Sequence, residues 1–258
     1  MSDVVKPDYG NWVPRKMLIV SVIVLCVSCV LSVVISIGWL RIFFIVTAVL
    51  SGVFFVYIAY AYWLLPKNDS EIQKNICNTV LDTITWSGDG KALDIGTGSG
   101  RLAIAIARRF PSASVKGVDL WGNIWTYSRD VCNNNAEIEG VADRVSFQRG
   151  GAENLPFEDG EFDVVTSNYV FHAVKVLNKN RTGLMKEALR VLKDGGVFAF
   201  QDLYNKQFYG DMELVFKELE TWGLKELGVV DTLEHVRIPI ALRLDHMVGG
   251  SKIVYGRK

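Results

Sequence analysis

The sequence predicts an α/β domain, with a parallel sheet covered by helices on both faces, preceded by a hairpin of two membrane-spanning helices. Three observations predict this architecture. Two long uncharged runs lie in the first quarter of the 258-residue chain, and short apolar runs then alternate with helical patterns. A glycine-rich turn, ALDIGTGSGR at residues 92–101, follows the first apolar run of that second part. The length allows one α/β domain and a small appendage.

The two uncharged runs have the length of membrane spans. No charged residue occurs at 17–37 or at 42–65, and each run exceeds the roughly 18 apolar residues typical of a span. Four residues, Gly38–Arg41, separate them and predict a tight turn. Small residues recur at four-residue spacing and favour close helix packing in lipid: Ser28, Ser32 and Ser36 on the first run, Ala48 and Gly52 on the second. The same stripes leave open a homo-oligomer that forms through the hairpin.

The flanking charges predict an orientation for this hairpin. Arg41 is the single charge in the turn, whereas basic residues flank both ends: Lys6, Arg15 and Lys16 before it, Lys67 and Lys74 after it. The positive-inside rule therefore predicts a multi-pass cell-membrane protein with both termini and the following domain in the cytoplasm. A cleaved signal peptide is an alternative, but its apolar region is shorter and no second span follows it. Two buried core helices are a further alternative. We expect an anchor at 1–66 and a soluble domain at 67–258.

Composition narrows the partners of this domain. Lys and Arg balance Asp and Glu at 28 each, and no basic stripe appears, so we expect no nucleic-acid partner. Cys77 and Cys132 stand alone, and Cys26 and Cys29 lie inside an apolar run. We therefore expect no metal site and no disulfide framework.

Beyond Pro66 the apolar pattern predicts alternating strands and helices. A lead-in helix is expected at 69–86. Expected strands are 91–95, 114–119, 145–149, 162–167 and 196–201, with a late strand at 251–256; expected helices are 101–109, 123–139, 182–192 and 208–222. The stretch 225–247 has no legible pattern. In such a sheet, ligands bind beyond the carboxyl ends of the strands.

The glycine turn lies at such an end. Gly96, Gly98 and Gly100 can adopt angles closed to other residues and let a ligand lie against the main chain. Asp119 closes the second strand and can accept hydrogen bonds from a ribose. The dinucleotide fingerprint G-x-G-x-x-G would need glycine at position 101, which is Arg. This spacing argues against a nicotinamide-dependent oxidoreductase.

The order of several motifs resembles class I S-adenosylmethionine-dependent methyltransferases of the small-molecule type. The motifs are the acid-preceded G-x-G-x-G turn, NAEIEGV with DRV at 135–145, RGGAENLPF at 149–157, EFDVVTSN at 161–168 and VLKDGGVF at 191–198. The resemblance covers roughly residues 75–202. It implies a Rossmann-like fold with a mostly parallel seven-stranded sheet, and S-adenosylmethionine as methyl donor.

The resemblance also implies donor-binding residues. Asp94 holds the methionine end, the three glycines pass beside the carboxylate and ribose, Asp119 binds the ribose, and Leu120 lies against the adenine. Gly151 and Ala152 frame the adenine edge. Many relatives carry Asp at the position of Gly151, so either Glu153 replaces that contact or the contact is lost, at about 1–3 kcal/mol.

Candidate catalytic residues follow the fourth and fifth strands. His172 is a candidate base because an imidazole titrates near neutral pH, although a packing role for it is open. Asn168 can bind the methionine moiety or the acceptor, and Asp202 faces the same crevice. We expect a membrane-anchored methyltransferase acting on a small, lipophilic acceptor. The alternative is a membrane-bound sensor or docking module that binds the donor without turnover.

Overall fold

The computed structural model describes residues 5–66, 68, 70–122, 127–176, 181–245 and 247–258. Lys67, used above to predict orientation, lies outside these residues. The described chain divides into two compact units. One contains residues 10–70, and the other contains the rest, including residues 5–9 from the N-terminal side of the hairpin.

The first unit is an antiparallel pair of long helices, α1 (Arg15–Val34) and α2 (Gly38–Leu64). Ser21 and Ser28 of α1 are buried, and a Cβ at Gly52 would lie 3.7 Å from the Leu25 side chain. Ser28 and Gly52 therefore lie where the two helices approach, as predicted, whereas Ser36 lies beyond the end of α1 and is exposed. By length and composition each helix could cross a membrane, and most of their apolar side chains are exposed in the protein alone.

The position of the turn differs from the prediction. Gly38–Arg41 forms the first turn of α2, and the Arg41 amide donates to the Ile37 carbonyl. The chain reverses one step earlier, at Ile35 and Ile37, whose backbones are extended. The sequence placed the break at the charge, but an arginine is a good helix former and β-branched isoleucines favour extended backbone.

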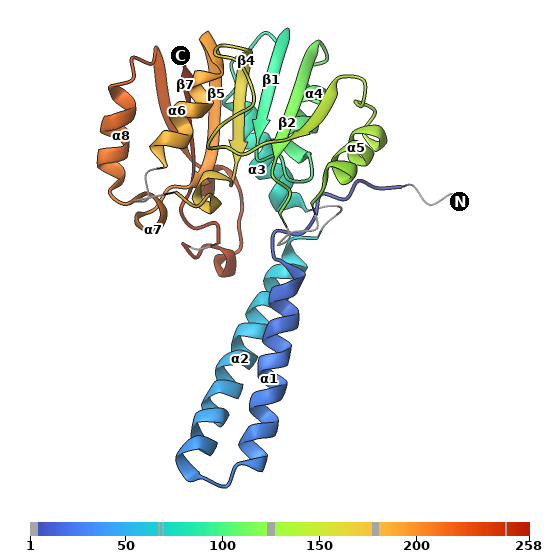
Figure 1. The fold of residues 1–258 in the computed structure, drawn as a ribbon, viewed down its shortest axis with the longest axis vertical. Helices are drawn as coiled ribbons and strands as arrows, with labels where there is room; N and C mark the ends of the chain where they lie inside the picture. The colour runs from blue at the N-terminus through green and yellow to red at the C-terminus, as the bar shows by residue number, and fades with distance from the viewer. Residues whose placement is uncertain (1–4, 67, 69, 123–126, 177–180, 246) are drawn as a thin grey trace. The chain divides into compact units, whose positions relative to one another are not determined.

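The second unit contains, among the described residues, one seven-stranded sheet with strand order β3-β2-β1-β4-β5-β7-β6 (Figure 1). Its strands are β1 (Gly90–Ile95), β2 (Ala113–Asp119), β3 (Val145–Arg149), β4 (Phe162–Asn168), β5 (Leu192–Leu203), β6 (Glu226–Asp231) and β7 (Ser251–Arg257). β1 to β5 are parallel, and β7 runs antiparallel to β5 and β6. The prediction of a mostly parallel seven-stranded sheet is confirmed.

Helices cover both faces of this sheet because alternate strand residues point to opposite sides. Ala92, Val115 and Val164 pack on one face, in a core shared with α3 (Glu71–Asp82), α4 (Arg101–Arg109) and α5 (Arg129–Ile138). Leu93, Val165 and Phe198 pack on the other face, with α6 (Thr182–Arg190) and α8 (Met212–Glu220). The sheet edge where β1, β2, β4 and β5 end carries the candidate site.

The C-terminal part was predicted least well. The expected helix 208–222 is two helices, α7 (Lys206–Tyr209) and α8, because Gly210 adopts a positive φ and Asp211 caps the second. The illegible stretch contains β6, α9 (Thr232–His235) and a 3-10 turn at Ile240–Leu242. β6 lies at the edge of the sheet, and most of its residues are only partly buried, so its sequence lacks a strong apolar pattern.

Candidate functional site

The glycine turn lies between β1 and α4 and has the left-handed backbone angles that its composition predicts. The φ values of Gly96, Gly98 and Gly100 are 67°, 58° and 84°, in the left-handed region. Space is also restricted, since a Cβ at Gly96 would lie 2.2 Å from a methyl group of Val170. The amides of Gly96 and Thr97 both donate to the Val118 carbonyl, which fixes the turn against the end of β2.

Asp119 organises the other side of this turn. Its Oδ2 accepts from the Gly98 amide at 2.8 Å and its Oδ1 accepts from the Trp121 amide at 2.7 Å. Each carboxylate oxygen keeps a further lone pair for a hydroxyl group. Trp121 has a φ of 46°, and its indole Nε1 donates to the Gly98 carbonyl at 2.9 Å. The end of β2 and the glycine turn therefore form one rigid cradle.

Asp94, at the end of β1, is 1% exposed. Its Oδ1 accepts from the Thr166 hydroxyl at 3.1 Å. Burial raises the pKa of Asp94 to about 7, while hydrogen bonds from Thr97, Thr166 and the Ala103 amide act in the opposite direction. A buried carboxylate with this pKa is well suited to a cationic group, which would supply the positive charge it lacks.

The loop after β3 brings together the residues expected at the adenine edge. Leu120 is 52% exposed, and a Cβ at Gly151 would lie 3.7 Å from it. That same Cβ would lie 2.8 Å from Oε2 of Glu153, so the Glu153 carboxylate occupies the space of an acidic side chain at 151. Ala152 is buried. An apolar surface and an acceptor group thus lie side by side.

Unpaired polar atoms at the end of β4 fit a bound polar molecule. The Ser167 hydroxyl and Oδ1 of Asn168 are buried and have no hydrogen-bond partner among the described residues. Such atoms are rare in folded proteins and cost free energy unless a ligand or water satisfies them. With the glycine cradle and Asp94, they fit the polar end of the methyl donor that the resemblance implies.

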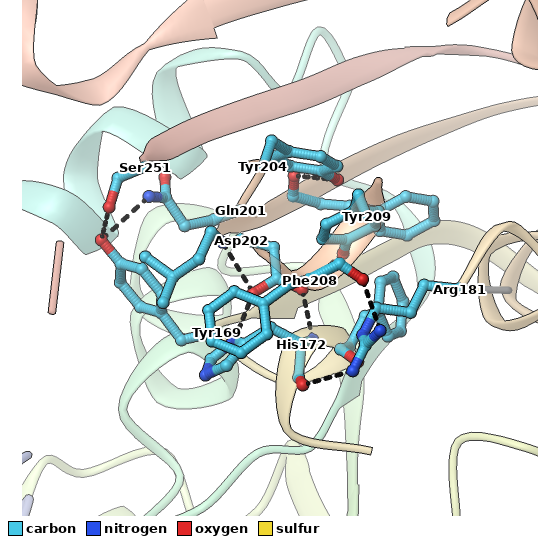
Figure 2. A network of polar contacts seen from close by, with 12 residues as sticks. Tyr169, His172, Arg181, Gln201, Asp202, Tyr204, Phe208, Tyr209 and Ser251 are labelled. Atoms are coloured by element: carbon cyan, nitrogen blue, oxygen red, sulfur yellow. Dashed lines mark hydrogen bonds and ion pairs between the residues drawn. The ribbon is translucent and has the colours of Figure 1, made fainter. Parts of the chain in front are cut away.

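His172 and Asp202 come together at the ends of β4 and β5 (Figure 2). His172 lies in the 3-10 turn Phe171–Ala173, and its Nδ1 is 2.5 Å from Oδ1 of Asp202. Asp202 is fully buried and also accepts from the His172 amide, the Leu203 amide and the Tyr209 hydroxyl. Because the carboxylate can only accept, Nδ1 carries the proton and Nε2 carries the lone pair. The imidazole is 20% exposed.

Arg181 fixes the backbone around this pair. Its guanidinium donates to the carbonyls of Phe171, His172 and Phe208 at 3.0, 2.9 and 2.5 Å (Figure 2). Neither Arg181 nor Tyr209 was predicted from the sequence, because neither lies in a recognisable motif and both reach the site through tertiary contacts. Tyr169 has a φ of 57°, a strained value for a tyrosine, and its hydroxyl is 2.6 Å from the Ser251 hydroxyl.

Comparisons with known proteins identify the region around this site. Residues 93–200 match the family model of a methyltransferase domain. The chain is 35% identical over 152 residues to malonyl-[acyl-carrier protein] O-methyltransferase of Geobacter sulfurreducens, covering 58% of this chain and 49% of that protein. It is 30% identical over 152 residues to a ubiquinone/menaquinone biosynthesis C-methyltransferase of Geotalea daltonii, covering 58% and 59%.

A solved structure shares the fold of the unit that contains the sheet. Geranyl diphosphate C-methyltransferase from Streptomyces coelicolor, in complex with S-adenosylhomocysteine, is 16% identical. It aligns with a TM-score of 0.53 over 72% of this chain and 79% of that chain. The chain spans about half the length of the curated relatives it matches. The family match and the relatives support S-adenosylmethionine as the methyl donor that the sequence implies. Within the described residues, no group of three His, Cys, Asp or Glu side chains could hold a metal ion.

Proposed function

We propose that the protein is a membrane-anchored methyltransferase that transfers a methyl group to a hydroxyl of a small, lipophilic acceptor, with His172 as general base. The observation that carries this proposal is the His172–Asp202 pair at the carboxyl edge of the sheet, beside the donor-binding turn. Two long apolar helices precede the domain and supply the anchor. The orientation predicted from flanking charges puts the domain in the cytoplasm.

The donor, when bound, supplies a methyl group on a positively charged sulfur. The residues of this chain bind the donor, orient the acceptor and remove the proton of the acceptor hydroxyl. Asp94, the glycine turn, Asp119 and Asn168 hold the donor, with Leu120, Ala152 and Glu153 at the adenine. His172 Nε2 takes the proton of the acceptor hydroxyl as its oxygen bonds to the methyl carbon and the bond from that carbon to sulfur breaks.

Asp202 and Arg181 serve the base indirectly. Asp202 holds Nδ1–H, which keeps the lone pair on Nε2 and stabilises the imidazolium that forms. Arg181 holds the His172 carbonyl, which limits movement of the turn. General bases of this kind contribute roughly 10²–10⁴-fold to rate.

The nature of the acceptor is inferred from the anchor and from relatives. A membrane anchor concentrates the domain where lipophilic molecules partition. One relative is named for malonyl-[acyl-carrier protein] and another for ubiquinone/menaquinone biosynthesis, and the second name supports an apolar acceptor. The alternative is a sensor that binds the donor without turnover. It is favoured by Gly151, which stands where many relatives have an acid.

A labelling experiment tests the proposal. The detergent-purified full chain is incubated with methyl-labelled S-adenosylmethionine and either a membrane-lipid extract or a polar-metabolite extract, and labelled products are identified by mass spectrometry. We expect label in the lipid extract. The His172→Gln variant should lose at least 100-fold in rate with unchanged S-adenosylhomocysteine affinity.

His235→Gln, on α9, is the matched control and should behave as the parent. Label that appears in polar metabolites alone contradicts the lipophilic acceptor. Tight donor binding without transfer to any extract favours the sensor instead.

A further inference from the structure

Arg101, the first residue of α4, is partly buried, and two of its three guanidinium nitrogens have no hydrogen-bond partner among the described residues. These two nitrogens, Nε and Nη2, are inaccessible to solvent. A guanidinium has five N–H donors and is charged under all ordinary conditions. Leaving it buried and unpaired costs several kcal/mol by general experience, so a buried unpaired cation calls for an anion.

The protein groups around Arg101 do not supply that anion. The ring of Tyr9 lies under the guanidinium, with 4.1 Å between Cζ and the ring centroid. Cys77 is also near, and burial raises its pKa to about 12, so the thiol is neutral. Tyr127 is near and also neutral, because burial raises the pKa of its hydroxyl.

Glu139 is the one acidic side chain among the groups that influence Arg101, and it is engaged elsewhere. Its Oε1 accepts from the Tyr9 hydroxyl at 3.0 Å, and its Oε2 accepts from Nη1 of Arg108 at 2.5 Å. Glu139 therefore compensates Arg108 directly and Arg101 only at a distance. Burial is accordingly the largest influence on Arg101 and lowers the pKa of its guanidinium.

Arg101 is held beside the glycine turn by the segment that precedes the hairpin. The Tyr9 carbonyl accepts from the Ser99 hydroxyl at 2.8 Å. The backbone N–H and carbonyl of Asp8 pair with the side-chain amide of Asn135, both at 2.8 Å. Tyr127 lies on the same side, since a Cβ at Gly98 would be 3.4 Å from its ring. The unsatisfied guanidinium thus lies at the donor-binding turn, in a fixed position.

We propose that Arg101, supported by the Tyr9 ring, binds the α-carboxylate of the methionine moiety of the methyl donor. That carboxylate is the single anionic group of S-adenosylmethionine, and a guanidinium fork matches carboxylate geometry. Arg101 is then a donor-specificity residue, and the segment 5–9 is part of the donor site. This inference rests on donor binding by the methyltransferase domain and is independent of the acceptor.

A pair of ligands that differ in one carboxylate tests the assignment. Isothermal titration of the full chain in detergent micelles compares S-adenosylmethionine with decarboxylated S-adenosylmethionine, which keeps the sulfonium and the amine. Arg101→Met should lower the affinity for S-adenosylmethionine roughly 10- to 100-fold, which is the range expected for the loss of a charge-assisted hydrogen bond. Its affinity for the decarboxylated ligand should stay within about twofold of the parent. Tyr9→Leu should shift the two affinities in the same pattern, to a smaller extent.

Arg108→Met is the matched control, because Arg108 lies on the same helix and pairs with the same Glu139. It should leave both affinities unchanged. An equal loss of affinity for the two ligands in Arg101→Met overturns the assignment and means that Arg101 only stabilises the fold. Should Arg101→Met fail to fold, Arg101→Lys supplies the test, since it keeps the charge and loses the fork; the same preferential loss of S-adenosylmethionine is expected. A parent chain that binds neither ligand contradicts donor binding itself, whereas a chain that binds donor but methylates nothing contradicts only the proposed function.

Discussion

At the scale of single residues, the candidate site combines a carboxyl group whose ionisation burial disfavours with buried polar atoms that have no hydrogen-bond partner among the described residues. Asp94 is 1% exposed and its pKa is raised to about 7. The folded state therefore prefers the protonated form. This preference contributes fully to stability below the unfolded pKa near 3.8 and is lost as the pH rises through about 7.

Asp94→Asn should therefore stabilise the donor-free protein at pH 8 by about 2–4 kcal/mol, because it removes the cost of a buried charge. Near pH 4 the substitution should have little effect, since Asp94 is then protonated. Thermal unfolding of both proteins across pH 4–8 measures this difference. A variant that is less stable than the parent at pH 8 would show that the carboxylate is satisfied in the free protein.

We predict that Glu153 supplies the contact that an acid at position 151 would make. Its carboxylate lies where the side chain of an acid at 151 would lie. Glu153→Gln should weaken S-adenosylhomocysteine binding roughly tenfold, the effect of losing one charged acceptor. Titration calorimetry measures the affinity. Glu158→Gln, an exposed acid further along the same loop, should have no effect; equal effects of the two would mean that Glu153 acts through general charge.

At the scale of elements, the segment 5–9 belongs to the unit that contains the sheet, although it precedes the hairpin in sequence. Asn135 on α5 holds it. The side-chain amide of Asn135 accepts from the Asp8 amide and donates to the carbonyls of Asp8 and Ser99. Asn135 is 0% exposed; its bond to the Ser99 carbonyl is buried, and its two bonds to Asp8 are partly buried.

Asn135→Ala should destabilise the domain by about 2–4 kcal/mol and release this segment, because the three hydrogen bonds of a buried side chain are lost. Hydrogen exchange should show lost protection at the Asp8 amide. Asn134→Ala, on the exposed face of the same helix, is the control. Unchanged protection at Asp8 in the Asn135 variant would contradict the role of this contact.

At the scale of the whole molecule, we expect the two apolar helices to hold the chain in a bilayer. The full chain should remain in the membrane pellet after alkaline carbonate washing. Introducing Val24→Arg and Phe54→Arg together, one charge near the centre of each helix, should move it to the soluble or aggregated fraction, at roughly 2.5–3.5 kcal/mol per charge. Val229→Arg, on a partly exposed strand of the sheet, should not. Extraction of the parent by carbonate would favour two core helices instead.

The sequence alone determined those features that depend on local pattern. Strand β3 and helix α4 have the predicted boundaries, and the apolar periods located β1, β2 and β4 to within a residue or so. The glycine turn was predictable because its conformation is a property of glycine itself. The location of Asp119 and Asp94 at one edge of the sheet was predictable, because residues at the carboxyl ends of adjacent parallel strands meet there.

Tertiary structure alone decided the features that join distant segments. It brings Asp202, on a strand 30 residues further along the chain, to His172. It also brings Tyr9, which precedes the hairpin in the sequence, to Arg101, which follows it. It also made a strand of 226–231, which pairs with β7 at the sheet edge and carries little apolar pattern of its own. A local pattern records which face of an element is buried. It does not record which side chain of another element meets that face, because those contacts depend on how the whole sheet and its helices pack.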